Sequence, residues 1–359
     1  MNDEAGTDGD GGMIGEPFSR TEADAVEWLR DLGAPLVVCA NDPPWSALRP
    51  RLADRLAAEV PAWDMDVDHL AAQVARVQSE VAADALSDSV VVGIGGGTGL
   101  DTAKYVAWRL DRPLVQVPSI TSVDASFTDA IGVRDRGRVR YVGRVVPRMV
   151  LLDLPLIRSA PKRLNRAGVG DVLSCHTGLW DWRLASSAGH GHPWHDGLAA
   201  LGARLLDELE AAVTEIAEVS DDGVRFLADA YRRIGAACAW AGHSRFEEGS
   251  EHFWAYAYEH NTGAHPVHGE IIGFATCALA HVQGNDPDRA HRIVADAHVR
   301  AHPDDLGVSR HDFDHALLGL AAYARANELD IGVADLRSID SAAADAAWSF
   351  VSSLPRRGD

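Results

Sequence analysis

The chain has 359 residues, of which 47% are hydrophobic and 24% are charged, and its 33 Lys and Arg against 53 Asp and Glu leave a net charge of -20. So acidic a chain repels phosphate backbones and anionic lipid heads, which disfavours nucleic acid and membrane surfaces as partners. No apolar run reaches the roughly 18 residues of a membrane-spanning helix, and the first residues are polar and acidic, unlike a signal peptide. We expect a cytoplasmic protein of about two domains.

The first part of the chain begins with a segment that lacks the apolar residues of a core. Residues 1–15 are rich in Gly and Asp and are predicted to form a disordered tail. Helices are predicted over 22–32, 50–60 and 66–86, and a short apolar run predicts a buried strand over 35–40.

A continuous β-branched run, Ser89–Ile94, is typical of a parallel strand that is covered on both faces. The elements predicted after it are a helix over 99–110, a strand over 113–117, a hairpin over 132–143 with Gly137 at its turn, and a strand over 148–152. Strands and helices that alternate at this spacing predict a doubly wound, Rossmann-like α/β sheet.

After about residue 160, long stretches of Ala, Leu, Glu and Arg with helical spacing replace the strand-like runs. Helices are predicted over 198–216, 224–241, 269–281, 286–301, 311–326 and 341–353. We therefore predict an α/β domain over 16–160, an all-α domain over 161–359, and an active-site cleft between them.

Glycines stand between the buried strand and the next helix, in the motif GIGGGTGLDTAK at residues 93–104. Glycines in such a turn let backbone N–H groups approach a pyrophosphate at the positive end of the helix. The strict GxGxxG pattern is not matched, because Thr98 stands where its last Gly should be. A tight turn without a ligand is therefore the alternative.

Two further groups of polar residues lie where ligands gather. The segment PSITSVD, residues 118–124, directly follows a predicted strand, so its hydroxyls and Asp124 are expected at the same crevice; a helix-capping turn is the alternative. Asp171, His252 and His268 are predicted on separate helices facing the cleft, which would make a three-ligand site with an open position for a catalytic divalent metal. Either histidine alone is more often a core or surface residue.

Five motifs, taken in this order, carry a family resemblance. They are GIGGGTGLDTAKY, VPSITSVDAS, LNRAGVGDVLSCHTGLWDWRLA, SRFEEGSEHF and HGEIIGF, which together span about residues 90 to 275. The chain resembles the superfamily of iron-containing alcohol dehydrogenases and dehydroquinate synthases. Within it, the chain is most similar to sn-glycerol-1-phosphate dehydrogenases.

This resemblance implies a metal-dependent dehydrogenase that uses NAD or NADP. Asp171, His252 and His268 would bind one divalent metal, Zn²⁺ first and Ni²⁺ or Fe²⁺ as alternatives, and Asp124 would face the substrate. The residues implied at the cofactor are Gly95, Gly96, Gly97 and Asp101 at its diphosphate, Thr121 and Ser122 along it, and Asn41 or Asp42 at the adenosine ribose. Asp42 would favour NAD, because an acid there suits a free 2′-hydroxyl.

Neighbouring residues have alternative roles in this interpretation. Glu251 or Glu270 would orient a metal-bound imidazole, or simply be solvated or cap a helix. His260 or His265 would relay the substrate's proton, or be plain loop residues.

The chain departs from glycerol-phosphate enzymes on the expected substrate side. Val123 stands where those enzymes usually have His, Phe246–Glu248 replaces a small uncharged stretch, and Phe253–Tyr258 replaces a stretch that normally holds Ser-His. These changes favour a substrate other than glycerol phosphate. The extra carboxylates disfavour a phosphate group unless arginines such as Arg144, Arg166 or Arg245 offset them.

We therefore predict interconversion of a polyol, or a polyol phosphate such as glycerol 1-phosphate, and its ketone. The alternative is a sugar-phosphate cyclase of the dehydroquinate synthase type, which shares the sixteen-residue separation of the histidines and uses NAD transiently. Cyclases typically have Glu in place of Asp171 and several active-site lysines, whereas this chain has only Lys104 and Lys162. A small molecule is thus the expected partner, and the long helices are also suited to an interface between copies of the chain.

Overall fold

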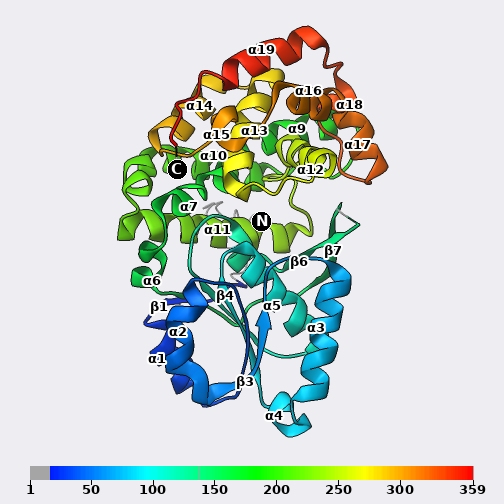
Figure 1. Ribbon diagram of the computed structural model, residues 1–359. Helices are drawn as coiled ribbons and strands as arrows, with labels where there is room; N and C mark the ends of the chain where they lie inside the picture. Colours follow the sequence, from blue (N-terminus) through cyan, green and yellow to red (C-terminus); the bar gives the residue numbers. More distant parts are fainter. Residues whose placement is uncertain (1–16, 137, 359) are drawn as a thin grey trace, which may run out of the picture.

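The computed structural model describes residues 17–136 and 138–358, so the predicted tail and the turn residue Gly137 lie outside the described residues. An α/β sheet occupies one end of the molecule and a group of helices the other (Figure 1). This confirms the predicted fold class. The division into two domains at residue 160 stays a prediction.

Six parallel strands form the sheet, in the order β1-β8-β5-β4-β2-β3. Their bounds are Arg20–Glu22 (β1), Leu36–Ala40 (β2), Leu56–Pro61 (β3), Val90–Gly95 (β4), Leu114–Pro118 (β5) and Met149–Leu152 (β8). From β2 the chain moves to β3 on one side, whereas from β4 it moves to β5 and β8 on the other. The direction of winding therefore reverses between β2 and β4, and ligands of open α/β sheets bind outside the carboxyl ends of the strands at such a point.

Helices cover both faces of the sheet. Val38 and Val92 pack with α1 (Ala25–Asp31) and α2 (Pro44–Leu52) on one face. Their neighbours Val37 and Val91 pack with α3 (Val67–Glu80) and α5 (Gly97–Leu110) on the other. Successive side chains of a strand point to opposite faces, so a strand covered twice must be apolar at nearly every position, as predicted for β4.

The helix predicted over 50–60 is wrong. Helix α2 ends at Leu52, a 3-10 turn follows over Ala53–Arg55, and Leu56–Pro61 is the edge strand β3. The run of Ala, Leu and Glu favours a helix locally, but the backbone of this segment pairs with β2, and pairing with a neighbouring strand overrides local propensity.

Two other predicted boundaries differ from the structure. The helix predicted over 66–86 is interrupted at Val81, whose backbone is extended, so that α3 is followed by a separate short helix, α4 (Ala83–Ser87). Strand β1 was not predicted, because it has only three residues and exists through its pairing with β8.

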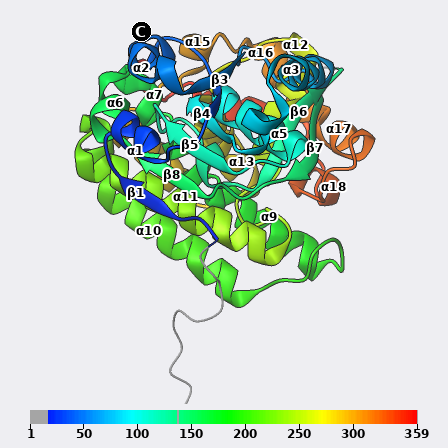
Figure 2. The ribbon, with the colours of Figure 1, turned by 90° about the horizontal axis from the view of Figure 1, so that it is seen from below.

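The predicted hairpin is confirmed by β6 (Ala130–Asp135) and β7 (Arg138–Arg144), which pair antiparallel. It reaches toward the helical part: Arg134 Nη2 lies 2.9 Å from Glu259 Oε2 on α12. On another side, α11 lies beside β1 (Figure 2), where Arg20 Nε donates to Asp229 Oδ1 at 3.0 Å. The two parts of the molecule are therefore connected on both sides of the sheet.

Helices make up the described chain from residue 154 onward, as predicted, apart from loops. They are α6 (Leu154–Ser159), α7 (Lys162–Arg166), α8 (Val169–Leu173), α9 (Cys175–Ser187), α10 (Asp196–Glu218), α11 (Asp221–Ala241), α12 (Ser250–Thr262), α13 (His268–Gln283), α14 (Pro287–Asp296), α15 (Pro303–Leu306), α16 (Arg310–Leu318), α17 (Leu320–Ala326), α18 (Val333–Leu336) and α19 (Ser341–Val351). The helix predicted over 286–301 ends at Asp296, and that over 311–326 is divided at Gly319. Among the described helices, none is long and apolar enough to cross a membrane.

Candidate functional site

A cavity of about 1340 Å³ lies between the carboxyl edge of the sheet and the helical part. Its walls come from the loops after β2, β3 and β5, the glycine turn after β4, the β6–β7 hairpin, and helices α6, α7, α8, α11, α12 and α13. The cavity therefore opens where the winding of the sheet reverses, which is the expected place for a ligand.

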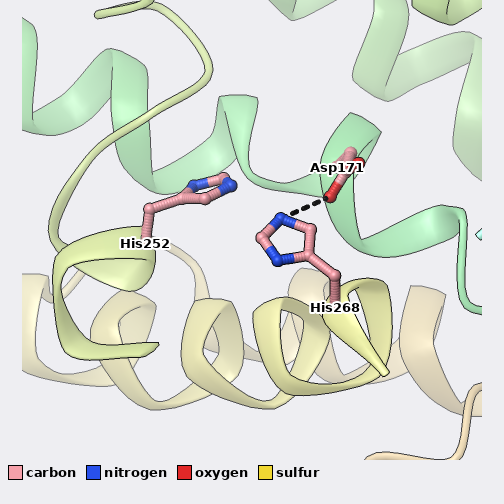
Figure 3. A group of neighbouring side chains, drawn as sticks. All are labelled: Asp171, His252 and His268. Carbon is pink, nitrogen blue, oxygen red and sulfur yellow. Dashed lines mark ion pairs between the residues drawn. The ribbon is translucent and has the colours of Figure 1, made fainter. Parts of the chain in front are cut away.

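Three predicted metal ligands meet in this cavity. Asp171 on α8, His252 on α12 and His268 on α13 offer ligand atoms that all lie within 4.8 Å of one another. Figure 3 shows the three side chains pointing toward one another from separate helices, with His268 Nε2 3.5 Å from Asp171 Oδ1. The structure thus brings together residues that are far apart in the sequence.

Glycines allow the helices that carry these side chains to touch. A Cβ on Gly170 would lie 2.2 Å from the carbonyl oxygen of Gly269, and a Cβ on Gly269 would lie 1.9 Å from that of Ala167. Both positions therefore require glycine. Each of these two glycines is the chain neighbour of a predicted ligand, so their close approach places Asp171 beside His268.

The electrostatics of Asp171 fit a metal ligand. The residue is 3% exposed, and burial raises the pKa of its carboxyl to about 6. Its Oδ2 accepts a hydrogen bond from the backbone N–H of Asp124 at 2.9 Å, whereas its buried Oδ1 accepts none. A buried carboxylate oxygen without a donor is costly unless a cation or proton pairs with it. One carboxylate and two imidazoles are a donor set that suits Zn²⁺, Ni²⁺ or Fe²⁺.

Of the two glutamates considered for orienting an imidazole, Glu251 contacts one and Glu270 does not. Glu251 Oε1 accepts hydrogen bonds from His252 Nδ1 at 3.0 Å and from the Gly249 backbone N–H at 2.6 Å, so His252 Nε2 is the ring nitrogen left for a metal. Glu270 instead makes a bidentate pair with Arg163, at 2.7 and 3.1 Å. We assign Glu251 as a positioning residue and Glu270 to the packing of α13.

Glu251→Gln is expected to lower metal affinity about 10- to 100-fold, because a neutral amide orients and polarises the His252 imidazole less strongly. The affinity is measured by competition between the protein and a fluorescent zinc chelator. The control is Glu259→Gln, which removes another cavity carboxylate, one that pairs with Arg134. Equal affinities for wild type and Glu251→Gln would contradict this positioning role.

The glycine turn after β4 has the features of a diphosphate site. Gly95 has φ +142°, and a Cβ there would lie 2.1 Å from Asn41 Oδ1, so only glycine fits. Helix α5 follows without a side-chain cap, which leaves backbone N–H groups at its start for an anion. Gly96, Gly97 and Asp101 line the cavity, and the buried Lys104 Nζ holds Asp101 Oδ1 at 2.9 Å.

The residues predicted after β5 divide into two groups. Ser122 and Asp124 line the cavity. Burial and the charge of Asp171 raise the pKa of Asp124 to about 7. Thr121 is not among the lining residues: its N–H donates to Asn165 Oδ1 at 2.9 Å, and its carbonyl accepts from Tyr231 Oη at 2.8 Å. The structure therefore places Thr121 in the packing between the sheet and the helices.

At the carboxyl end of β2, both Asn41 and Asp42 line the cavity. Either of the two residues predicted at the adenosine ribose could therefore contact a ligand in it. Asp42 Oδ1 also accepts from the Ser46 N–H at 3.0 Å. Of the two histidines considered for a proton relay, His265 lines the cavity and His260 does not.

Trp63 and Met65 line the cavity but were not singled out from the sequence. Trp63 follows β3, and the helix predicted in place of β3 concealed that this residue stands at the carboxyl edge of the sheet. Tyr256 lies in the stretch Phe253–Tyr258, which was expected on the substrate side; it lines the cavity, and its Oη donates to Glu248 Oε1 at 2.8 Å.

Comparisons with known proteins identify relatives of this chain. A family model described as iron-containing alcohol dehydrogenase matches residues 25–161. The glycerol-1-phosphate dehydrogenase [NAD(P)+] of Hyperthermus butylicus is 31% identical over 63% of this chain and 64% of its own length, and that of Methanothrix thermoacetophila is 30% identical over 65% and 67%. The match thus spans less than two thirds of the length of the Hyperthermus butylicus protein.

The fold has a close structural counterpart. A crystal structure described as a probable glycerol dehydrogenase from Sinorhizobium meliloti 1021 superposes with a TM-score of 0.70 at 20% identity, covering 94% of this chain and 96% of that one. At this identity the likeness shows the fold. The sequence matches show that the chain belongs to the iron-containing alcohol dehydrogenase family of oxidoreductases.

Proposed function

We propose that the protein is a metal-dependent, NAD(P)-linked oxidoreductase that interconverts a small polyol, or its phosphate, and the corresponding ketone. The observation that carries this proposal is the position of Asp171, His252 and His268 in the same cavity as the glycine turn after β4. A divalent metal held there would act as a Lewis acid on the substrate oxygen while hydride moves between carbon and nicotinamide.

The residues of the chain supply the binding and the orientation in this reaction. The turn at Gly95 and the start of α5 would hold the diphosphate of the cofactor. Asp42 would accept a hydrogen bond from the adenosine ribose and repel a 2′-phosphate, which favours NAD over NADP. Asp124, beside Asp171, would accept a hydrogen bond from a substrate hydroxyl.

The charges around the cavity favour an unphosphorylated substrate. Two arginines line it, Arg134 and Arg144, and each already pairs with a carboxylate, at 2.9 and 3.1 Å. Ten carboxylates line it as well: Asp42, Asp64, Asp66, Asp101, Asp124, Asp129, Asp171, Glu247, Glu248 and Glu259. Asp129 and Glu259 are the partners of these two arginines, so Glu248, beside Tyr256, is left to repel a phosphate dianion on the substrate side of the cavity.

The other cations considered for binding a phosphate are occupied elsewhere. Arg166 Nε donates to the Ala217 carbonyl at 2.8 Å, and Arg245, 2% exposed, donates to the carbonyls of Glu248 and Ile331. Neither these arginines nor the two lysines of the chain line the cavity. The cyclase alternative, which calls for lysines at a phosphate, thus has no support from this cavity.

The proposal is tested by oxidation of NADH and NADPH with dihydroxyacetone and with dihydroxyacetone phosphate. The protein is stripped with a chelator and then reloaded separately with Zn²⁺, Ni²⁺ or Fe²⁺. We expect metal-dependent oxidation of NADH, with the larger kcat/KM for dihydroxyacetone. No oxidation with either ketone, in protein shown to bind both metal and NADH, would overturn the proposal.

Glu248→Gln is expected to raise kcat/KM for dihydroxyacetone phosphate relative to dihydroxyacetone about tenfold. The reason is that the Glu248 carboxylate, which lines the cavity and is held by the hydroxyls of Ser244 and Tyr256, would repel a phosphate. Glu27→Gln, at an exposed position on α1, changes the net charge equally and serves as the control. An unchanged ratio in Glu248→Gln would mean that this carboxylate does not select against phosphate.

A further inference from the structure

Trp63 is a large apolar side chain exposed in the wall of a cavity. It lies just after β3, lines the cavity, and is 63% exposed. Its indole is nevertheless held: Nε1 donates to His69 Nδ1 on α3 at 3.1 Å, and the two ring centroids are 4.7 Å apart. A flat apolar face that is both open and fixed is suited to stack against a planar ligand.

The register of the sheet places Trp63 beside the predicted ribose site. Ala40 at the end of β2 pairs with Pro61 at the end of β3, and the Ala62 N–H donates to the Ala40 carbonyl at 2.9 Å. Asp42 and Trp63 each stand two residues beyond this pair of ends. They therefore leave neighbouring strands at the same level, on the same edge of the sheet.

The order of the strands then matches the order of groups in the cofactor. Ala40 also pairs with Ile94 of β4, which leads into the glycine turn, so the loops after β4, β2 and β3 follow one another along the edge. Neighbouring strands are about 4.8 Å apart. A dinucleotide with its diphosphate at the glycine turn and its ribose at Asp42 would have its adenine within reach of the loop after β3.

The surroundings of Trp63 suit a purine base. Pro43, Pro44 and Ala47, at the start of α2, supply apolar surface to the same cavity. Asp64 and Asp66 follow Trp63 and also line the cavity. Asp64 pairs with His69 and accepts from the Asp66 N–H, and Asp66 Oδ1 caps α3, so Asp66 Oδ2 is the carboxylate oxygen that remains for a ligand. Carboxylates accept hydrogen bonds from an amino group such as the exocyclic amine of adenine.

We propose that Trp63 is the residue on which the adenine ring of the nicotinamide cofactor stacks. This inference rests on the proposed function, because it takes the ligand of the cavity to be NAD(P). It implies that the loop after β3 contributes to the affinity for the cofactor through the adenosine half of that molecule alone.

The test compares Trp63→Ala and Trp63→Phe with wild type by calorimetric titration of NADH, ADP-ribose and reduced nicotinamide mononucleotide. Stacking of one base on an aromatic ring contributes a substantial part of the binding free energy, so Trp63→Ala should lower the affinities for NADH and ADP-ribose about tenfold or more. Trp63→Phe, which keeps an aromatic face, should stay within about threefold of wild type. The mononucleotide, which has no adenine, should bind all three proteins equally.

The matched control is Trp240→Ala. Trp240 is 44% exposed on α11 and is not among the residues that line the cavity, so its loss should leave all three affinities unchanged. Wild-type affinity of Trp63→Ala for ADP-ribose would overturn the stacking proposal while leaving the proposed function standing. A wild-type protein that binds neither NADH nor ADP-ribose would overturn both.

Discussion

Asp171→Asn is expected to lower kcat on the order of a thousandfold, while the affinity for NADH stays near that of wild type. A metal's stabilisation of charge on the substrate oxygen is worth several kcal/mol, and each 1.4 kcal/mol changes a rate about tenfold. Asn keeps the shape of the side chain but removes the anionic ligand from the group of three. The cofactor affinity is preserved because the glycine turn belongs to β4 and α5, whereas Asp171 belongs to α8.

Three measurements check this result: kcat, metal content by elemental analysis, and NADH affinity by titration. The control is His265→Ala, which removes a cavity histidine that is 71% exposed and lies outside the group of three. It should retain its metal. Wild-type turnover in Asp171→Asn, or equal losses of turnover and NADH affinity in a folded variant, would contradict the separation of metal and cofactor sites.

Gly168→Ala is expected to lower the free energy of unfolding by about 3 kcal/mol, the upper part of the range for overpacking a buried site. A Cβ at this position would lie 1.9 Å from the Thr121 carbonyl oxygen and 2.1 Å from Tyr231 Oη. Tyr231 Oη also lies 2.8 and 2.9 Å from the carbonyls of Thr121 and Gly168, so the added methyl group would displace the hydroxyl that joins the sheet to α8.

The check is the midpoint of thermal unfolding, with metal affinity as a second measurement because Asp171 is on α8. Gly273→Ala is the control: Gly273 is buried like Gly168 but lies within α13, and its added Cβ would make only ordinary contacts, 3.7 Å from Val299 and 3.8 Å from Val294. It should unfold at or above the wild-type temperature, since Ala favours the helix by about 0.5–1 kcal/mol. If the two variants unfold at the same temperature, the contact at Gly168 is not tight.

Features that depend on local chemistry could be predicted without a structure. The β-branched run of β4 requires cover on both faces, the glycines after it require a tight turn before a helix, and the strand-helix alternation requires a wound parallel sheet. For the same reason the predominance of helices after residue 160 was predicted, although the ends of helices such as α14 and α16 were not.

The identities of Asp171, His252 and His268 could likewise be proposed in advance, from residue type and family resemblance. Their meeting could not be derived from local pattern, because it depends on contacts between α8 and α13 that only glycine at 170 and 269 permits. Likewise, nothing local distinguishes Glu251 from Glu270: both stand near a histidine in the first turn of a helix, and only packing places one beside an imidazole and the other beside Arg163.

The alternating elements and the glycine turn were enough to predict the class of fold and the edge of the sheet at which the cavity lies. Long-range packing settled the rest. Leu56–Pro61 has the composition of a helix and becomes a strand because β2 offers it a backbone partner, and that pairing alone carries Trp63 to the cavity. The hydrogen bonds of a strand, unlike those of a helix, are made with residues distant in the chain, so their energy cannot be read from the segment itself.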